Sequence, residues 1–144
     1  MTHRAETILN TIEGLLTGLA TTGANVQRAR VWPVDSLPAL SIYKSDDLRS
    51  IEDALDNELT RELTVNINIH VKQTGNVETV LNQVAAEIFA AMSVDKTLGL
   101  AYVFNALLIG ETEPLIEDSQ DTPNAQMVSG WLVTYQHSDV SAEA

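Results

Sequence analysis

The chain has 144 residues, no cysteine and a formal net charge of −12, from 8 basic and 20 acidic residues. This length predicts one domain, residues 1–144, with an ordinary hydrophobic core and a frayed tail over residues 138–144. The lack of cysteine excludes disulfides, thiolate metal sites and thiol nucleophiles. The acidic balance argues against wrapping nucleic acid, because Lys and Arg neutralise phosphates in such complexes. No apolar run approaches the roughly 18 residues that a membrane span needs, so no membrane association is expected.

The N-terminal region predicts an amphipathic helix. Its apolar residues recur at helical spacing: Ile8, Ile12, Leu15, Leu16 and Leu19. We expect Thr2 to cap the start of this helix, and Gly23 to lie where the chain turns out of it.

Two short strands are expected next, over residues 29–34 and 39–44, with Pro33 and Pro38 at their ends. The acidic stretch 45–58 follows, and its apolar residues Leu48, Ile51 and Leu55 fall at near-helical spacing. Two interpretations stay open for this stretch, a short amphipathic helix or a mobile loop that orders against a neighbour. Its carboxylates lack the ligand spacing and central glycine of a calcium loop, which favours a solvated acidic segment. They are Asp46, Asp47, Glu52, Asp53 and Asp56.

The clearest pattern in the sequence is the unbroken alternation of residues 62–72. One side of the alternation is aliphatic: Leu63, Val65, Ile67, Ile69 and Val71. The other side is polar and includes His70. This pattern predicts a half-buried strand with one face on the core and one face wet or at an interface.

A second helix is expected after the turn at residues 74–76, with Asn76 as its N-cap. Its predicted core stripe is Val77, Val80, Leu81, Val84, Ala85, Ile88, Phe89 and Met92. After a turn or short helical piece at residues 95–98, two more strands are expected, over residues 102–111 and 125–137. The last strand is partly apolar on both faces, which suits a central strand or one covered by a partner.

The order of elements is therefore helix, three strands, helix, two strands. Short links between sequential strands imply antiparallel pairing, and two amphipathic helices can cover one face of a sheet. The sequence predicts an α+β two-layer sandwich, with a mostly antiparallel sheet of about five strands and two main helices packed on one face.

Residues with catalytic or metal-binding spacing are lacking. His3, His70 and His137 are far apart in sequence and are interpreted as surface residues. There is no nucleophile elbow, P-loop or dinucleotide-binding glycine motif. We expect no enzyme activity, no cofactor and no metal. A small ligand-binding domain or enzyme stays the lesser alternative, and a deep pocket with converging polar groups would favour it.

A second acidic cluster surrounds two aliphatic residues near the C-terminus. Its carboxylates are Glu111, Glu113, Glu117, Asp118 and Asp121, and the chain has no Lys or Arg after Lys96. Leu115 and Ile116 lie inside this cluster, where they either fill the domain's own core or dock on a partner. With Leu48, Ile51, Leu55 and His70, they are candidate contacts with another subunit or a partner.

These segments, in this order, resemble the tail terminator family of siphophages, which includes the minor tail protein U of lambda-like phages. The matching features start with the N-terminal helix leading to Arg30-Val31-Trp32-Pro33 and the proline-led strand at residues 37–43. The acidic segment, the alternating strand and the second helix follow in the family's order. The closing strand with Trp131-Leu132-Val133-Thr134-Tyr135 completes the resemblance, which covers nearly the whole chain.

The resemblance implies a structural protein of the virion, assembled in the host cytoplasm. Members of the family form a ring, typically of six subunits, on the head-proximal end of the tail tube, where they stop tube polymerisation and provide the head-joining surface. The implied partners are further copies of the chain, the tail tube protein and a head-completion or neck protein. DNA passes through without specific binding, and the two acidic clusters are candidates for the lumen wall. Charge repulsion reaches only about 8 Å at physiological salt, so the acids act only if they line the bore. Another neck protein, for head–tail joining or head closure, is the alternative.

Overall fold

The computed structural model describes residues 3–28, 38–49, 58–72, 76–117 and 124–138. The elements follow in this order: α1 (Arg4–Leu16), β1 (Val26–Gln27), β2 (Ala39–Arg49), β3 (Glu58–Lys72), α2 (Val77–Met92), β4 (Val103–Glu111), β5 (Leu115–Glu117) and β6 (Asn124–Ser138). Among the described residues, no helix combines the length and apolarity that crossing a membrane requires.

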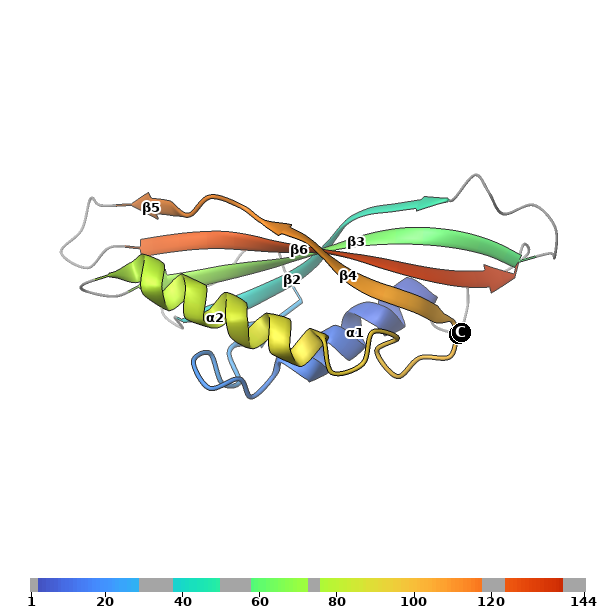
Figure 1. Ribbon diagram of the computed structural model, residues 1–144, viewed down its shortest axis with the longest axis horizontal. Coiled ribbons are helices and arrows are strands. Elements are labelled where there is room, and N and C mark those ends of the chain that lie inside the picture. Colours follow the sequence, from blue (N-terminus) through green and yellow to red (C-terminus); the bar gives the residue numbers. More distant parts are fainter. Residues whose placement is uncertain (1–2, 29–37, 50–57, 73–75, 118–123, 139–144) are drawn as a thin grey trace.

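The strands form one mixed, mostly antiparallel sheet in the order β1-β2-β3-β6-β4, and β5 also pairs with β6. β3 and β6 pair over their whole lengths, from Glu58 opposite Ser138 to Lys72 opposite Asn124. Only β1 runs parallel to its neighbour β2. Both helices lie on the same face of the long, twisted sheet (Figure 1). The predicted α+β two-layer architecture is confirmed, and so is the central position of the last strand.

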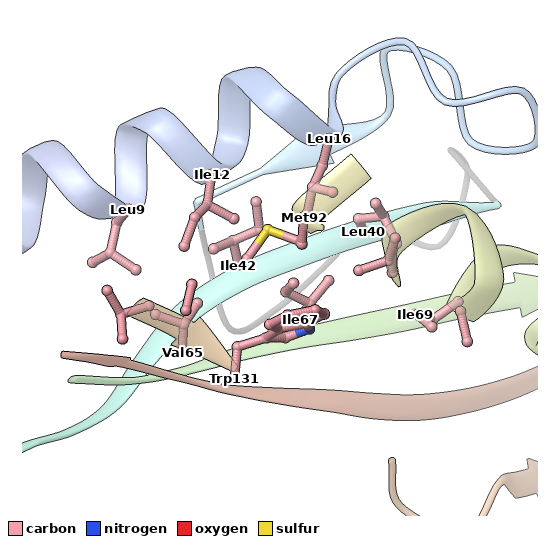
Figure 2. Packing of buried hydrophobic residues seen from close by; sticks show 14 of the residues in the cluster. Leu9, Ile12, Leu16, Leu40, Ile42, Val65, Ile67, Ile69, Met92 and Trp131 are labelled. Carbon is pink, nitrogen blue, oxygen red and sulfur yellow. The ribbon is translucent and has the colours of Figure 1, made fainter. Parts of the chain in front are cut away.

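The core lies between this sheet face and the helices. The five aliphatic residues of the alternating segment in β3 are at most 1% exposed, as their pattern predicts. Leu9, Ile12 and Leu16 of α1 point toward the sheet, with Met92 and Trp131 beside them (Figure 2). The Trp131 indole N–H donates to Ser129 Oγ at 3.0 Å, so the largest core side chain has its polar atom satisfied. Fully burying each large aliphatic side chain stabilises the fold by about 1.5–3 kcal/mol.

The helix N-termini use two different caps. Asn76 caps α2 as predicted, accepting a hydrogen bond from the Thr79 N–H at 3.3 Å. The cap of α1 is His3 rather than the expected Thr2, and the His3 ring accepts from the Ala5 N–H at 3.0 Å. A ring nitrogen can replace a hydroxyl here because the cap position needs only an acceptor within reach of the first free N–H groups.

Two parts of the helix predictions are wrong. Leu15 and Phe89, both expected to face the core, are 38% and 50% exposed. Each lies at the margin of its apolar stripe, and the sheet and the other helix fill the space beneath the stripe's centre. After α2 the chain forms turns at residues 96–99, which is one of the two alternatives left open for this segment, and Leu98 and Gly99 are at positive φ.

The strand predictions differ from the structure in three places. β2 does not end at residue 44 but continues to Arg49, so residues 45–49 form neither a helix nor a loop. Pairing with the first half of β3 decides this, because it brings Leu48 opposite Glu62. β1 and β5 are short strands that the sequence did not predict, and the expected strand at residues 29–34 lies outside the described residues.

Candidate functional site

The expected acidic loop is divided by the structure into an exposed part and a buried part. Asp46 is exposed on β2. The side chain of Asp47 is only 9% exposed, accepts a hydrogen bond from Arg61 at 3.1 Å, and accepts from the Tyr135 hydroxyl at 2.9 and 3.0 Å. The Asp47 side chain is therefore mostly enclosed by its contacts within the sheet, in contrast to Asp46.

Tyr135 and Arg61 are both perturbed by this contact. Burial raises the pKa of Tyr135, and the hydrogen bond to the Asp47 carboxylate raises it further, so the phenol stays protonated and donates. Burial opposes the charge of Arg61, but its contacts with Tyr135 and Asp47 outweigh burial and raise the pKa of the guanidinium. The three side chains come from β2, β3 and β6, so the cluster joins three strands at one end of the sheet.

The start of α1 packs against the same end of the sheet. The Arg4 guanidinium donates to the Gln136 carbonyl and lies over the Tyr102 ring, 4.4 Å from its centroid. His137 is 3% exposed, with its ring centroid 6.3 Å from that of Tyr135. The prediction of a surface His137 is therefore wrong. Burial, and then the charge of Arg61, lower the pKa of His3 at the helix cap.

This mixture of Asp, Tyr, Arg and His resembles an acid–base constellation in composition only. The Asp47 carboxylate is mostly enclosed, and each of its oxygens already accepts from Arg61 or Tyr135, so its printed contacts are with the protein's own strands. Within the part of the chain that the structure describes, no group of three His, Cys, Asp or Glu side chains is placed to hold a metal ion. What the cluster can do is fix β2, β3, β6 and the start of α1 relative to one another.

A shallow hollow of about 330 Å³ lies beside this cluster, between α1 and β2. Arg28 crosses its wall and forms an ion pair with Glu6 at 3.0 Å and a hydrogen bond with Asn10 at 2.6 Å. The hydrogen bond from Arg28 lowers the pKa of Glu6. The hollow is lined by His3, Ala5, Glu6, Leu9, Arg28, Ile42, Tyr43 and Lys44. The hollow is open, and the positive and negative side chains on its wall are partly paired with one another. Its lining therefore does not indicate one class of ligand.

The predicted contact residues that the structure describes lie mainly at the surface. Leu48 is 61% and Leu115 is 65% exposed, so Leu115 does not fill the core of its own domain. His70 lies on the outer sheet face, away from the helices, where burial lowers its pKa. Among the described residues its Nε2 atom has no hydrogen-bond partner. Ile116 lies in β5 opposite Ala125.

Of the second acidic cluster, Glu111 ends β4 and Glu113 lies in the connection to β5, both exposed, and Glu117 ends β5. The other predicted residues lie outside the described residues: Ile51, Glu52, Asp53, Leu55, Asp56, Asp118 and Asp121.

The exposed apolar residues of β4 were missed by the sequence analysis. Phe104, Leu107 and Ile109 are 52%, 46% and 60% exposed. In the sequence, residues 102–111 are mostly apolar but do not alternate regularly with polar residues. Large side chains therefore lie on both faces of the strand and at its two irregular positions. The register of β4 against β6 shifts between Val103 and Asn105 and again between Leu108 and Gly110. These shifts break the two-residue period from which a core face is read.

In comparisons with known proteins, no protein-family model matches the chain, and no curated protein sequence matches it either.

Proposed function

We propose that the chain is a phage tail terminator, which forms a ring on the head-proximal end of the tail tube. The ring stops tube polymerisation and provides the surface on which the head joins. The proposal starts from the sequence resemblance, which extends from the first helix to the closing strand. It is a proposal about assembly, so it requires surfaces that are incomplete in the single chain.

The observation that carries the proposal is the line of exposed apolar side chains along one edge of the sheet. Phe104, Leu107, Ile109 and Leu115 follow one another along β4 and β5, each about half exposed or more. Large apolar side chains exposed on neighbouring elements are unfavourable in water, and patches of them mark interaction sites. An edge strand that carries such side chains is also a template for pairing with another chain. Both properties fit a subunit of an assembly better than a protein that acts alone.

The acidity of the chain supports a second part of the proposal, passage of DNA through the ring. Asp46, Glu111 and Glu113 are exposed, and no Lys or Arg follows Lys96 in the sequence. A bore lined by such residues repels phosphates at close range and does not retain DNA. The triple variant Asp46→Lys, Glu111→Lys, Glu113→Lys is expected to assemble and to slow DNA delivery. Normal delivery would mean that these residues are not on the bore.

Removal of the gene from the phage tests the function itself. The expected result is tails of uncontrolled length, and normal tails after removal would contradict the proposal. Purified tails made without heads separate the two neck functions, because a terminator is present on such tails and a head-closure protein is absent.

A further inference from the structure

One edge of the sheet is formed by β4, and we call the side of β4 that faces away from β6 the β4 edge. β4 is the last strand in the strand order, so no strand of the described ranges lies beyond this edge. The Val103 N–H donates to the Leu100 carbonyl at 3.2 Å, and the open stretch of the edge therefore starts after Val103. A row of open N–H and C=O groups is a template for pairing with another strand.

A second copy of the chain presents the same edge in the direction that pairing needs. A two-fold axis perpendicular to the sheet places β4 beside β4 of the second copy and makes the two strands antiparallel. β4 is already antiparallel to β6, so the alternation continues across the contact. The open backbone groups of both edges then satisfy one another as in any antiparallel ladder, and the helices of both copies stay on one face of the joined sheet.

The irregularities of β4 indicate where this pairing is centred. The register of β4 against β6 shifts on both sides of the segment Asn105–Leu108. Because such shifts interrupt a ladder, regular pairing with another strand is expected around this segment. Within it, Leu107 lies opposite Leu132, on the face of the sheet away from the helices. A two-fold axis close to Leu107 brings the Leu107 side chains of the two copies opposite each other.

The side chains along the β4 edge are apolar and suit such a contact. Phe104, Leu107 and Ile109 are 52%, 46% and 60% exposed. In an antiparallel pair centred on Leu107, Phe104 of each copy lies close to Gly110 of the other. A Cβ at Gly110 would meet no atom within 4 Å, so there is open space for an aromatic ring. The second copy therefore covers apolar side chains that otherwise face water.

The charge on β4 does not oppose this contact. Glu111 is the only charged residue of the strand. In the antiparallel pair the two Glu111 residues lie at opposite ends of the contact, about 27 Å apart at the usual rise of a strand. Charge repulsion reaches only about 8 Å at physiological salt, so the two carboxylates do not repel each other appreciably. The contact depends on backbone pairing and apolar burial, and needs no opposite charges.

The helix layer leaves room for a second copy. α2 packs beneath β3 and β6, so it lies back from the β4 edge. With strands about 4.8 Å apart, the α2 helices of the two copies lie about 19 Å apart, whereas directly packed helices need only about 8–10 Å. An open hollow of about 390 Å³ lies between α2 and the end of β4, lined by Asn82, Ala85, Ala86, Phe89 and Glu111.

We propose that the partner of the β4 edge is the β4 edge of a second copy of this chain, related by a two-fold axis close to Leu107, so that the two sheets join into one. Such a contact is isologous: it uses one surface twice and closes with two subunits. It does not build a ring, so the inference goes beyond the proposed function and does not rest on it. Because it covers part of the apolar line at the sheet edge, it describes the free chain before assembly with other proteins.

The absence of natural cysteine gives a direct test by disulfide crosslinking. Leu107→Cys places two sulfur atoms near each other across the axis, and oxidation of this single variant is expected to give a covalent dimer. Ile109→Cys is the matched control, because Ile109 is at least as exposed but is displaced from the axis along the strand. The Ile109 residues of the two copies lie about 14 Å apart, which is too far for a disulfide.

Charges placed at the axis test the same contact without crosslinking. Leu107→Lys and Leu107→Glu each put two like charges opposite each other, which is destabilising for a strand pair. Each variant alone is expected to be monomeric in sedimentation velocity at concentrations at which the unmodified protein is dimeric. An equal mixture of the two variants is expected to recover the dimer, because unlike charges then face each other. Leu107 is half exposed, so these substitutions leave the hydrophobic core in place.

Several results would overturn the pairing. A protein that is monomeric at all concentrations overturns it, and so does an oligomer in which Leu107→Cys forms no covalent dimer. Crosslinking as fast in Ile109→Cys as in Leu107→Cys overturns it as well, because that would mean random contact. A dimer that persists in both charged variants places the contact elsewhere on the molecule. A dimer with all the expected properties, together with normal tails in a phage without the gene, would support the pairing and contradict the proposed function.

Discussion

The Asp47–Tyr135 contact makes a quantitative prediction about the stability of the fold. The Tyr135 side chain is fully buried, and its hydroxyl donates to both oxygens of a carboxylate that also accepts from Arg61. A hydrogen bond to a charged group contributes about 1.5–3 kcal/mol when it is buried. Arg61 is 29% exposed, so its ion pair is partly screened and contributes less. We expect Tyr135→Phe to lower the free energy of unfolding by about 1.5 kcal/mol and Asp47→Asn by about 2 kcal/mol.

The two substitutions should not be additive, because both act on the same hydrogen bond: Tyr135→Phe removes its donor, and Asp47→Asn removes the charge of its acceptor. A coupling energy of about 1 kcal/mol is expected in the double-mutant cycle, measured by urea denaturation. Tyr102→Phe is the matched control, because the Tyr102 hydroxyl is buried and has no hydrogen-bond partner among the described residues. If Tyr135→Phe destabilises no more than Tyr102→Phe, or the cycle shows no coupling, the contact does not hold the strands as described.

Three further predictions concern the core, a helix cap and pH. Ile67→Ala should lower the free energy of unfolding by about 3–4 kcal/mol in urea denaturation, because Ile67 is fully buried between sheet and helices; a loss below 1 kcal/mol would contradict that packing. Asn76→Ala should cost about 1 kcal/mol and Asn76→Ser much less, since serine keeps the acceptor for the Thr79 N–H. Burial lowers the pKa of His70 from its ordinary value of 6.5. As the pH falls below 6.5, the unfolded chain therefore binds a proton at His70 before the folded chain does, and the free energy of unfolding decreases. The drop in unfolding free energy from pH 8 to pH 5.5 should be smaller in His70→Gln, and an unchanged drop would show that His70 does not contribute.

The elements that the sequence predicts correctly are those that local patterns determine. The alternation in β3 determines which face of the strand is buried, because a shift of one residue would expose all five aliphatic side chains. The stripe of α2 and its Asn76 cap are equally local. The second half of β2 is different, because it belongs to the stretch 45–58, whose acidic residues and spaced apolar residues fit a helix or a loop as well as a strand. Only the pairing with β3 makes it a strand, and that pairing joins residues on both sides of a segment that carries no local strand pattern.

The candidate site depends even more on distant contacts. Asp47 is 88 residues from Tyr135 in the sequence, so nothing near Asp47 distinguishes it from the exposed Asp46 beside it. The exposure of Phe89 likewise depends on where β4 runs relative to α2. For Leu115 the sequence left two alternatives open, a place in the core of the domain or a contact with a partner. Its exposure decides against the core. The residues proposed for contacts with partners are therefore visible as apolar or acidic in the sequence, but the surface that they form depends on the order of the strands.

The most direct test of the central claim is native mass spectrometry of the purified protein, followed by electron microscopy of the protein mixed with tail tubes. The account predicts one closed oligomer of fixed size and rings seated on a single end of each tube. A protein that stays monomeric and leaves both tube ends bare would contradict it.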